Sequence, residues 1–507
     1  MKKCTRLMTY SVFMLFSTLS AGAYAAEKTI TTDIVVVGGG STGLSAALTA
    51  AEGGAKVVLL EKNPYLGGSS NFAEGLFAVE SEYQRATSHG LTKDEAFEHI
   101  IEFNHYKVNA PLIRDFVNNS ADNIAWLNER GVDFELIQIS PTEPRVWHII
   151  KEKKPFVHGG ALISALQQKA KKLGVQILLR TPAKKLIYSD NKVTGVEAVD
   201  HKGNKITLNA KAVVIATGGF GNSKEKIAKW TEYDPETFLP ALPLNKTGDG
   251  IQMAKDVGAD TEGETLMPFL GARGKGIIPL QGINTMTWQP TNLWVNSSGK
   301  RFANEAVAFS FAQAANAVGR EHGDMAWAIF DDAAVDYAAQ AGVDNGVGVI
   351  VPVTTKLTGL RTEIKNALAV NSDGFKTGKS IEALAKQIGV PVDVLKKTYS
   401  NYNSYAENGY DPEFVKEHRW LKPLNQGSLY AVKMMPYHFT SIGGLSVNTK
   451  MEVLGSDNKP ISGLYAGGCD IGGLYGDTYT LWASGHAYGF AVYSGRVAGA
   501  SALEAAK

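Results

Sequence analysis

Short apolar runs rich in valine, isoleucine and leucine recur through the first half of the chain, bounded by glycines or polar residues. They include IVVV at 34–37, KVVLL at 56–60 and AVVI at 212–215. Runs of this length and composition predict buried strands. Residues 160–173 place apolar side chains at helical spacing and predict an amphipathic helix, which VQILL follows as another strand. Residues 27–264 therefore predict an α/β fold.

The pattern changes near residue 265 and changes back near residue 441. Residues 265–440 begin with irregular glycine-rich stretches and continue with helical patterns at 333–342 and 380–409. Residues 441–507 return to strands that end in glycines, and a helix is predicted at 487–503. The pattern agrees with one α/β unit in two sequence pieces, 27–264 and 441–507, with an inserted unit at 265–440.

Composition excludes several classes of protein. The chain has 507 residues, of which 44% are hydrophobic, so a disordered or fibrous protein is excluded and two or three domains are expected. Lysine and arginine together number 51 against 50 acidic residues. Because no charge surplus would attract nucleic acid or an anionic membrane, we expect partners to be recognised at local sites.

The N-terminus predicts export. Residues 1–25 carry Lys2, Lys3 and Arg6, then an apolar run, then the small-residue cleavage pattern Ala-Tyr-Ala, which together are typical of a secretory signal peptide. No later segment approaches ~20 uninterrupted apolar residues, so no membrane span is expected. Removal of the signal would leave Cys469 as the remaining cysteine, and the chain holds no CxxCH haem motif. We therefore expect a periplasmic protein without an internal disulfide or a haem of its own.

A glycine turn follows the first of these strands. Gly38, Gly40 and Gly43 have the spacing G-x-G-x-x-G and precede a helix-forming run. Such glycines permit a tight turn and let a pyrophosphate approach the helix N-terminus. The next strand ends at Glu61, about the ~20-residue offset at which a carboxylate accepts adenosine ribose hydroxyls. The pattern predicts a dinucleotide site, and nicotinamide and flavin dinucleotides both fit it.

Further glycine-rich segments favour the flavin. They read NPYLGGSSNFAEGLF at 63–77, AVVIATGGFG at 212–221 and SGLYAGGCDIGGLYG at 462–476. A nicotinamide enzyme does not require the first of these loops, whereas a buried flavin needs backbone amides near its N5 atom and its pyrophosphate. Several glycine-lined strand ends that converge on one ligand suit FAD in an extended conformation.

The order of the motifs resembles the flavoproteins of the fumarate reductase/succinate dehydrogenase family, in its soluble exported branch, and is also similar to 3-ketosteroid dehydrogenases. It comprises GGGxxG, GGSS, ATGGF, TGDG at 247–250, GKRFANE at 299–305, IGGL at 442–445, GLYAGG at 463–468 and SGRVAG at 494–499. The resemblance implies a Rossmann-like FAD-binding domain in the two pieces 27–264 and 441–507. It also implies that 265–440 is an α+β capping domain that closes over the flavin.

The same resemblance implies a set of FAD-binding residues. These are Gly38, Gly40, Ser41, Thr42, Gly43, Glu61, Lys62, Gly68, Ser69, Ser70, Gly75, Leu76, Ala183, Thr217, Gly218, Asp249, Gly468, Cys469 and Ser484. The second glycine loop holds no histidine, which argues against the histidyl flavin linkage of membrane-bound relatives. No metal site is predicted.

This chain lacks the polar groups with which fumarate reductases of the family bind and protonate their substrate. Their proton-donating arginine corresponds to Phe309, and the Glu-x-x-Arg pair that supplies it with protons falls near Thr285 and Trp288. Their two clamp histidines fall near Leu270 and Thr440. Because a dicarboxylate buried without cationic partners costs several kcal/mol per charge, fumarate is a poor substrate candidate.

Aromatic side chains replace many of these groups. The predicted substrate pocket comprises Phe269, Leu270, Trp288, Phe309, Thr440 and Trp482, and Trp294 lies in the same set of aromatic positions. A pocket of this kind suits a flat or bulky apolar substrate. For any single aromatic residue, packing in the core is the more frequent alternative.

Four residues are candidates for catalysis. Tyr479 lies in YGDTYT, which resembles the Gly-His-x-Tyr-Pro turn of 3-ketosteroid dehydrogenases, and it could polarise a carbonyl or donate a proton, as could Tyr475. The segment that follows, to residue 489, contains no clamp arginine. His438 either reaches the pocket or is a hydrogen-bonded core histidine. Arg273 either holds one carboxylate or lies in a solvated loop.

These residues predict a periplasmic FAD-dependent reductase of the C=C bond of an α,β-unsaturated carboxylate or ketone that is aromatic or bulky. We expect a separate cytochrome c or FMN-bearing protein to donate the electrons. One alternative is a ketosteroid-type dehydrogenase that runs in the oxidative direction. A second is an FAD-binding electron-transfer or sensor protein without turnover, for which Phe309 is the best argument.

Overall fold

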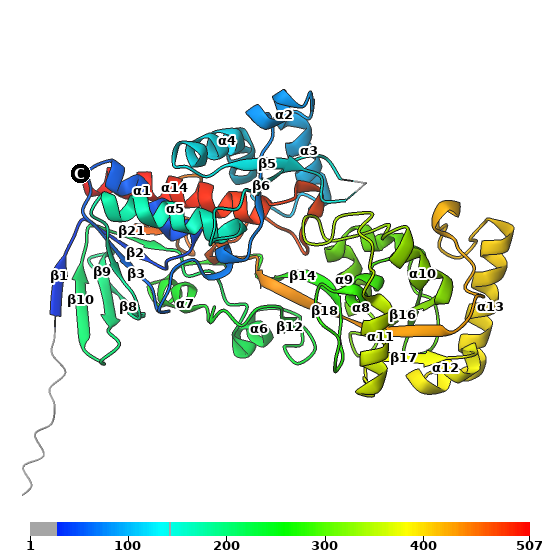
Figure 1. Ribbon diagram of the computed structural model, residues 1–507. Helices are drawn as coiled ribbons and strands as arrows, with labels where there is room; N and C mark the ends of the chain where they lie inside the picture. The colour runs from blue at the N-terminus through cyan, green and yellow to red at the C-terminus, as the bar shows by residue number, and fades with distance from the viewer. Residues whose placement is uncertain (1–27, 141–142) are drawn as a thin grey trace, which may run out of the picture.

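The computed structural model describes residues 28–140 and 143–507, so the predicted signal peptide at 1–25 lies outside the described residues. Figure 1 shows two lobes joined by the strand β18. One lobe is built on a large sheet whose parallel centre has the order β21-β11-β2-β3-β7. Its strands are β21 (Pro460–Ala466), β11 (Ala212–Ile215), β2 (Ile34–Val37), β3 (Val57–Leu60) and β7 (Gln176–Leu178).

The central strands β2, β3 and β11 are fully buried along their length, which confirms the predicted strands. Continuous apolar runs of this kind are typical of parallel strands covered on both faces. The sheet extends through β9 (Lys192–Val199), β10 (Lys205–Asn209) and β1 (Lys28–Thr31), with β8 (Ala183–Ser189) paired to β9 and β20 (Glu452–Leu454) paired to β21.

Three helices lie together beside this sheet in Figure 1: α1 (Ser41–Glu52), α5 (His158–Lys172) and α14 (His486–Ala506). The last two confirm the helices predicted at 160–173 and 487–503. Glycines let α1 and α14 pack closely, because a Cβ atom on Gly495 would lie 2.3 Å from the Thr42 carbonyl oxygen and one on Gly499 would lie 2.4 Å from that of Ala46. The SGRVAG motif is therefore a helix-packing surface.

A small sheet, β4-β6-β5, lies beside the N-terminal end of α14. It comprises β4 (Gly75–Phe77), β5 (Phe134–Ile137) and β6 (Trp147–Ile150), and the helices α2 (Glu82–Ala86), α3 (Lys93–Phe103) and α4 (Ala110–Glu129) accompany it. Gly485, at the start of α14, lies so close to β4 that a Cβ atom there would be 2.6 Å from the Leu76 carbonyl carbon. This contact fixes the second glycine loop against α14.

The second lobe contains a six-stranded sheet of β12 (Leu239–Pro240), β14 (Leu266–Ala272), β15 (Leu293–Asn296), β16 (Ala326–Asp331), β17 (Phe375–Gly378) and β18 (Leu429–Ser441). Its helices are α8 (Gly282–Met286), α9 (Phe311–Gly319), α10 (Asp332–Gln340), α11 (Leu360–Ala369), α12 (Ile381–Ile388) and α13 (Val392–Asn408). The helical segments predicted at 333–342 and 380–409 are confirmed. The boundary at 265 stays a prediction, and β12, upstream of it, already pairs with β18.

Short elements join the lobes: α6 (Lys224–Trp230), α7 (Asp249–Lys255), β13 (Thr261–Glu262) and β19 (Gly444–Leu445). In the part of the chain that the structure describes, no helix combines the length and apolar character that a membrane crossing requires.

A buried ion network explains the GKRFANE motif. The Arg301 guanidinium contacts a Glu305 oxygen at 2.7 Å and an Asp411 oxygen at 2.8 Å, and the Lys416 amine lies 3.2 Å from Glu305. All four side chains are at most 1% exposed. Two cations and two carboxylates thus compensate one another inside the second lobe, so the loss of any one of them would leave an uncompensated buried charge.

Candidate functional site

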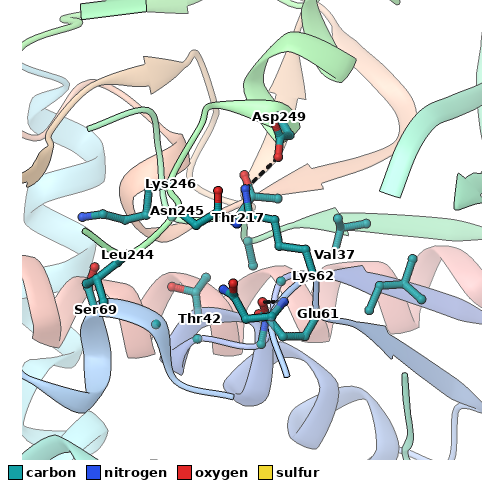
Figure 2. Close-up of a pocket in the computed structure, with 18 of the residues that line it drawn as sticks. Val37, Thr42, Glu61, Lys62, Ser69, Thr217, Leu244, Asn245, Lys246 and Asp249 are labelled. Carbon is teal, nitrogen blue, oxygen red and sulfur yellow. Dashed lines mark hydrogen bonds and ion pairs between the residues drawn. The ribbon is translucent and has the colours of Figure 1, made fainter. Parts of the chain in front are cut away.

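A cleft of about 850 Å³, measured with the open space at its mouth, lies at the carboxyl ends of β2, β3 and β11. Ligands of doubly wound sheets bind at this edge. Figure 2 shows its wall, formed by segments that are far apart in the sequence: Val37 and Thr42, Glu61 and Lys62, Ser69, Thr217, and Leu244 to Asp249. The predicted glycine-lined strand ends therefore do meet in one place.

The three motif glycines have two different functions. Gly38 has φ +113°, and a Cβ atom there would lie 2.0 Å from the Ala216 carbonyl oxygen; one on Gly43 would lie 1.9 Å from the Gly38 carbonyl oxygen. Both glycines are required for the turn itself. A Cβ atom on Gly40 would meet nothing within 3.6 Å of it, its nearest neighbour being the Gly67 oxygen at 3.7 Å, so Gly40 leaves room at the cleft. That room beside the N-terminus of α1 fits the pyrophosphate of FAD.

The Glu61 carboxylate closes one end of the cleft. One of its oxygens accepts a hydrogen bond from the Gly39 amide at 2.9 Å, and the other accepts one from the Asn63 amide at 2.7 Å. Each oxygen keeps a further lone pair that a ribose hydroxyl can use. Beside it, the Lys62 amine donates to Thr247 at 2.7 Å and to Asp249 at 2.8 Å.

The second glycine loop forms another wall. Ser70 Oγ accepts from the Ser41 amide at 3.1 Å and lies 2.9 Å from Ser41 Oγ, which ties the loop to the start of α1. Ser69 also lines the cleft, and its buried hydroxyl has no hydrogen-bond partner among the described residues. An unpartnered hydroxyl at this wall fits a ligand with hydrogen-bonding groups.

Asp470 holds the loop after β11 in place. Its carboxylate accepts hydrogen bonds from the Thr217 hydroxyl at 2.8 Å and from the amides of Gly218 at 2.9 Å and Gly219 at 3.0 Å. Burial raises the pKa of this carboxyl group, and the hydrogen bonds oppose that shift. Asp470 was not among the predicted residues, although it follows the predicted Cys469 directly.

Most of the predicted cofactor residues line the cleft. They are Gly38, Gly40, Ser41, Thr42, Glu61, Lys62, Gly68, Ser69, Ser70, Ala183, Thr217, Gly218, Asp249 and Cys469. The remaining five, Gly43, Gly75, Leu76, Gly468 and Ser484, do not line it, although Gly43 lies against Gly38 and Gly468 against Thr42 of its wall. Gly468 also donates its amide to Ser494 at 2.9 Å.

Sequence reasoning missed the cleft residues Leu244, Asn245 and Lys246, which precede the TGDG motif. Lys246 is 5% exposed, and its amine donates to the Phe439 carbonyl at 2.7 Å. Burial lowers the pKa of this amine to about 8. A lysine in a loop is ordinarily solvated, so no feature of the sequence predicts its burial.

Glu74 was not predicted either, because a charged residue in a loop is ordinarily solvated. It lies between the cleft wall at Ser70 and β4 and is partly buried, and in the described structure its carboxylate makes no hydrogen bond or ion pair. Burial raises the pKa of this carboxyl group to about 7. This value is suited to proton transfer near neutral pH.

The predicted catalytic tyrosines lie together beside the start of α14. Tyr475 and Tyr479 have ring centroids 5.4 Å apart, and the Tyr475 hydroxyl lies 2.9 Å from Nδ1 of His486. Burial raises the pKa of Tyr479 to about 12 and that of Tyr475 well above its ordinary value. Burial lowers the pKa of His486 to about 3, so its ring is neutral at physiological pH.

His438 is fully buried on β18, and neither ring nitrogen has a hydrogen-bond partner among the described residues. Burial, with a smaller contribution from the charge of Lys246, lowers the pKa of this ring to about 3. Arg273 lies at the end of β14, where its guanidinium donates to the Thr237 carbonyl at 3.2 Å. Neither residue lines the cleft, and their catalytic roles stay predictions.

The predicted pocket residues form buried aromatic contacts in the second lobe and at its border. Phe269 packs against Trp288 and Phe439 with ring centroids 5.7 and 4.9 Å apart, and the Trp288 indole donates to the Leu270 carbonyl at 2.9 Å. Phe309, 7% exposed, packs against Trp420. Thr440 is buried, and Trp482 stacks on His99 with a centroid distance of 3.9 Å. Their assignment to a substrate pocket stays a prediction.

Comparison with known proteins agrees with this geometry. The family model described as an FAD binding domain matches residues 33–485. The chain is 36% identical over 480 residues to a vinyl phenol reductase from Lactiplantibacillus plantarum, an alignment that covers 93% of this chain and 96% of that protein.

Solved structures give the same result. A flavocytochrome c3 fumarate reductase in its open conformation superimposes with a TM-score of 0.72 at 29% identity and covers 94% of this chain and 79% of its own. A 3-ketosteroid dehydrogenase from Rhodococcus jostii superimposes with a TM-score of 0.75 at 22% identity, covering 95% of this chain and 99% of its own, and shows the shared fold. These matches confirm the predicted fold class and the predicted resemblance.

The cleft has a glycine turn, a carboxylate and an unpartnered hydroxyl that fit FAD, and the family match covers most of the chain. The chain belongs to the FAD binding domain family, as a flavoprotein oxidoreductase related to the fumarate reductases, and its cofactor is FAD.

Proposed function

We propose that this flavoprotein reduces a C=C bond conjugated to an aromatic ring, in a hydroxystyrene or a cinnamate-type acid. The observation that carries the proposal is the cluster Phe269, Trp288, Phe311 and Phe439, with Phe309 nearby in sequence, at or close to positions where fumarate reductases hold charged groups. The vinyl phenol reductase that aligns with nearly the whole chain supports the same substrate class.

Physical chemistry favours a substrate with little charge. Aromatic rings in contact provide a large apolar surface, which suits a flat aromatic substrate and cannot solvate two carboxylates. FAD supplies the hydride for such a reduction when it is bound. The chain must hold the substrate, exclude water and deliver one proton to the other carbon of the double bond.

Glu74 joins the predicted Tyr479 as a candidate for that proton. A general acid is most effective when its pKa lies near the working pH, and the pKa of Glu74 is about 7 whereas that of Tyr479 is about 12. Glu74 also follows the loop whose serines line the FAD cleft. We therefore assign proton delivery to Glu74 and keep Tyr479 as the group that orients the substrate.

The proposal includes the cellular setting predicted from the sequence. A signal peptide at 1–25 would export the protein to the periplasm, where nicotinamide cofactors are not available. A separate cytochrome c or FMN-bearing protein would then deliver the electrons, and the enzyme would act as a terminal reductase.

Oxidation of dithionite-reduced viologen by the FAD-loaded protein tests the substrate class. We expect turnover with 4-hydroxystyrene or a cinnamate and, at equal concentration, at least a hundredfold lower kcat/KM with fumarate. Preferential fumarate turnover would contradict the proposal, as would no turnover with any aromatic alkene. Substitution of Phe309→Arg, which restores a cation at the family's position, should lower the rate with the aromatic substrate.

A further inference from the structure

Lys246 is a buried cation without a carboxylate partner. Its amine donates to the Phe439 carbonyl at 2.7 Å, and no aspartate or glutamate of the described chain lies within ion-pair distance of it. Other lysines of low exposure differ: Lys62 pairs with Asp249 at 2.8 Å, and the fully buried Lys416 contacts Glu305 at 3.2 Å. Lys246 therefore carries a charge that the protein alone does not neutralise.

The surroundings of Lys246 are uncharged. His438 lies close enough for each charge to affect the other, and its ring is neutral at physiological pH. The Cys469 thiol is also nearby, and burial raises its pKa, so the thiol is protonated. An uncompensated buried ammonium group costs several kcal/mol, and an anion that arrived beside it would recover much of that cost.

The position of Lys246 indicates which anion this is. Lys246, Cys469 and Ser69 line the same cleft, and in Figure 2 the Lys246 amine is directed toward the Ser69 side, away from Glu61 and Asp249. If Glu61 receives the adenosine ribose, the opposite end of an extended FAD, with its ring system, lies on the Lys246 side. Reduction of a flavin by two electrons and one proton leaves one additional negative charge on that ring system.

We propose that Lys246 neutralises the negative charge that FAD gains on reduction and thereby raises the reduction potential of the bound flavin. The inference rests on FAD binding and not on the identity of the alkene, so it can fail while the proposed substrate class holds. In this scheme the charge of Lys246 acts on the cofactor, and a hydrogen bond to the Phe439 carbonyl holds the lysine amine in place.

A redox titration of FAD-loaded protein without alkene tests the proposal. Lys246→Met should weaken binding of reduced FAD at least tenfold relative to oxidised FAD, which corresponds to a midpoint potential lower by about 30 mV. Affinity for sulfite, whose adduct also adds negative charge to the flavin, should fall at least tenfold. Lys246→Arg keeps the charge and should retain the wild-type potential, while Lys246→Gln serves if the methionine variant does not load FAD.

Lys226→Met is the matched control. This half-buried lysine donates to the Thr247 and Gly248 carbonyls on the same loop, and it does not line the cleft. Its loss should leave the potential and the sulfite affinity unchanged. An unchanged potential in both neutral Lys246 variants would overturn the proposal. Equal weakening of oxidised and reduced FAD would also overturn it and would assign Lys246 to the pyrophosphate.

Discussion

Burial changes the proton affinity of the Glu74 carboxyl group. Its pKa rises from 4.5 to about 7, so the protonated form is present below neutral pH and the carboxylate above it. Desolvation is the cause of the raised pKa, and no charged group of the described chain lowers it again.

If Glu74 delivers the proton, alkene reduction should be fastest below pH 7 and should fall about tenfold per pH unit well above it, since the acid form is the active one. Glu74→Gln should lower kcat by roughly 10²–10⁴ and remove this pH dependence. The measurement is kcat against pH with 4-hydroxystyrene and reduced viologen.

Glu135→Gln, an exposed change on β5, is the control and should keep the wild-type profile. A Glu74→Gln variant with wild-type kcat and an unchanged pH profile would transfer the role to Tyr479, where Tyr479→Phe tests it.

Some residues of the site could be predicted from the sequence, whereas the burial of others could not. The motif glycines and Glu61 were predicted from their spacing and Asp249 from the family resemblance, and they line the cleft or shape its turn. The burial of Glu74 and Lys246 depends on segments far away in the chain, such as β18, which supplies the carbonyl that binds Lys246. A single sequence does not reveal which loop carboxylate or amine such segments will cover.

At the scale of elements, α5 supports the FAD cleft through its first turn. A Cβ atom on Gly159 would lie 1.8 Å from the Ser70 carbonyl oxygen, whereas one on Gly160 would meet its nearest neighbour, Phe156, at 3.8 Å. Two adjacent glycines of one helix thus differ in whether a methyl group fits.

Gly159→Ala should therefore displace the second glycine loop, destabilise the protein by about 1–3 kcal/mol and reduce FAD loading. Gly160→Ala should stabilise it by about 0.5–1 kcal/mol, because alanine is the better helix former. Urea unfolding and flavin content of the two purified variants provide the comparison. Equal effects of the two changes would contradict this account of the contact.

Elements were predictable where they are long or uniformly apolar. The buried runs of β2, β3 and β11 and the helices α5, α10, α13 and α14 follow from composition and period. The small sheet β4-β6-β5 was not predicted, since strands of three or four residues carry too little pattern. The two-residue strand β12 escaped for the same reason, although it helps to position the boundary between the lobes.

At the scale of the whole molecule, one apolar cluster runs from the sheet of the first lobe into the second lobe, where it includes Phe269, Trp288 and Trp294. The second lobe also contains the buried ion network of Arg301, Glu305, Asp411 and Lys416. Removal of one carboxylate from such a network leaves a buried cation without compensation.

Glu305→Gln should accordingly destabilise the second lobe by about 3–5 kcal/mol. Fluorescence of Trp288 and Trp294, which are fully buried in that lobe, should report unfolding at a lower denaturant concentration than in the wild-type protein. Glu382→Gln, which removes one partner of the exposed pair with Lys396, should leave the transition unshifted. An unshifted transition for Glu305→Gln would contradict this role of the ion network.

The position of β21 within the large sheet also determines when the enzyme can mature. This strand, Pro460–Ala466, lies between β9 and β11, and α14, which packs against α1, follows it. A ribosome-bound chain that has emerged only as far as residue 450 has already synthesised the glycine turn and Glu61. Its sheet nevertheless lacks an interior strand, and its cleft lacks the wall at Cys469. Because domains fold as units, the nascent polypeptide stays incompetent for flavin until β21 and the segment at Cys469 have been synthesised.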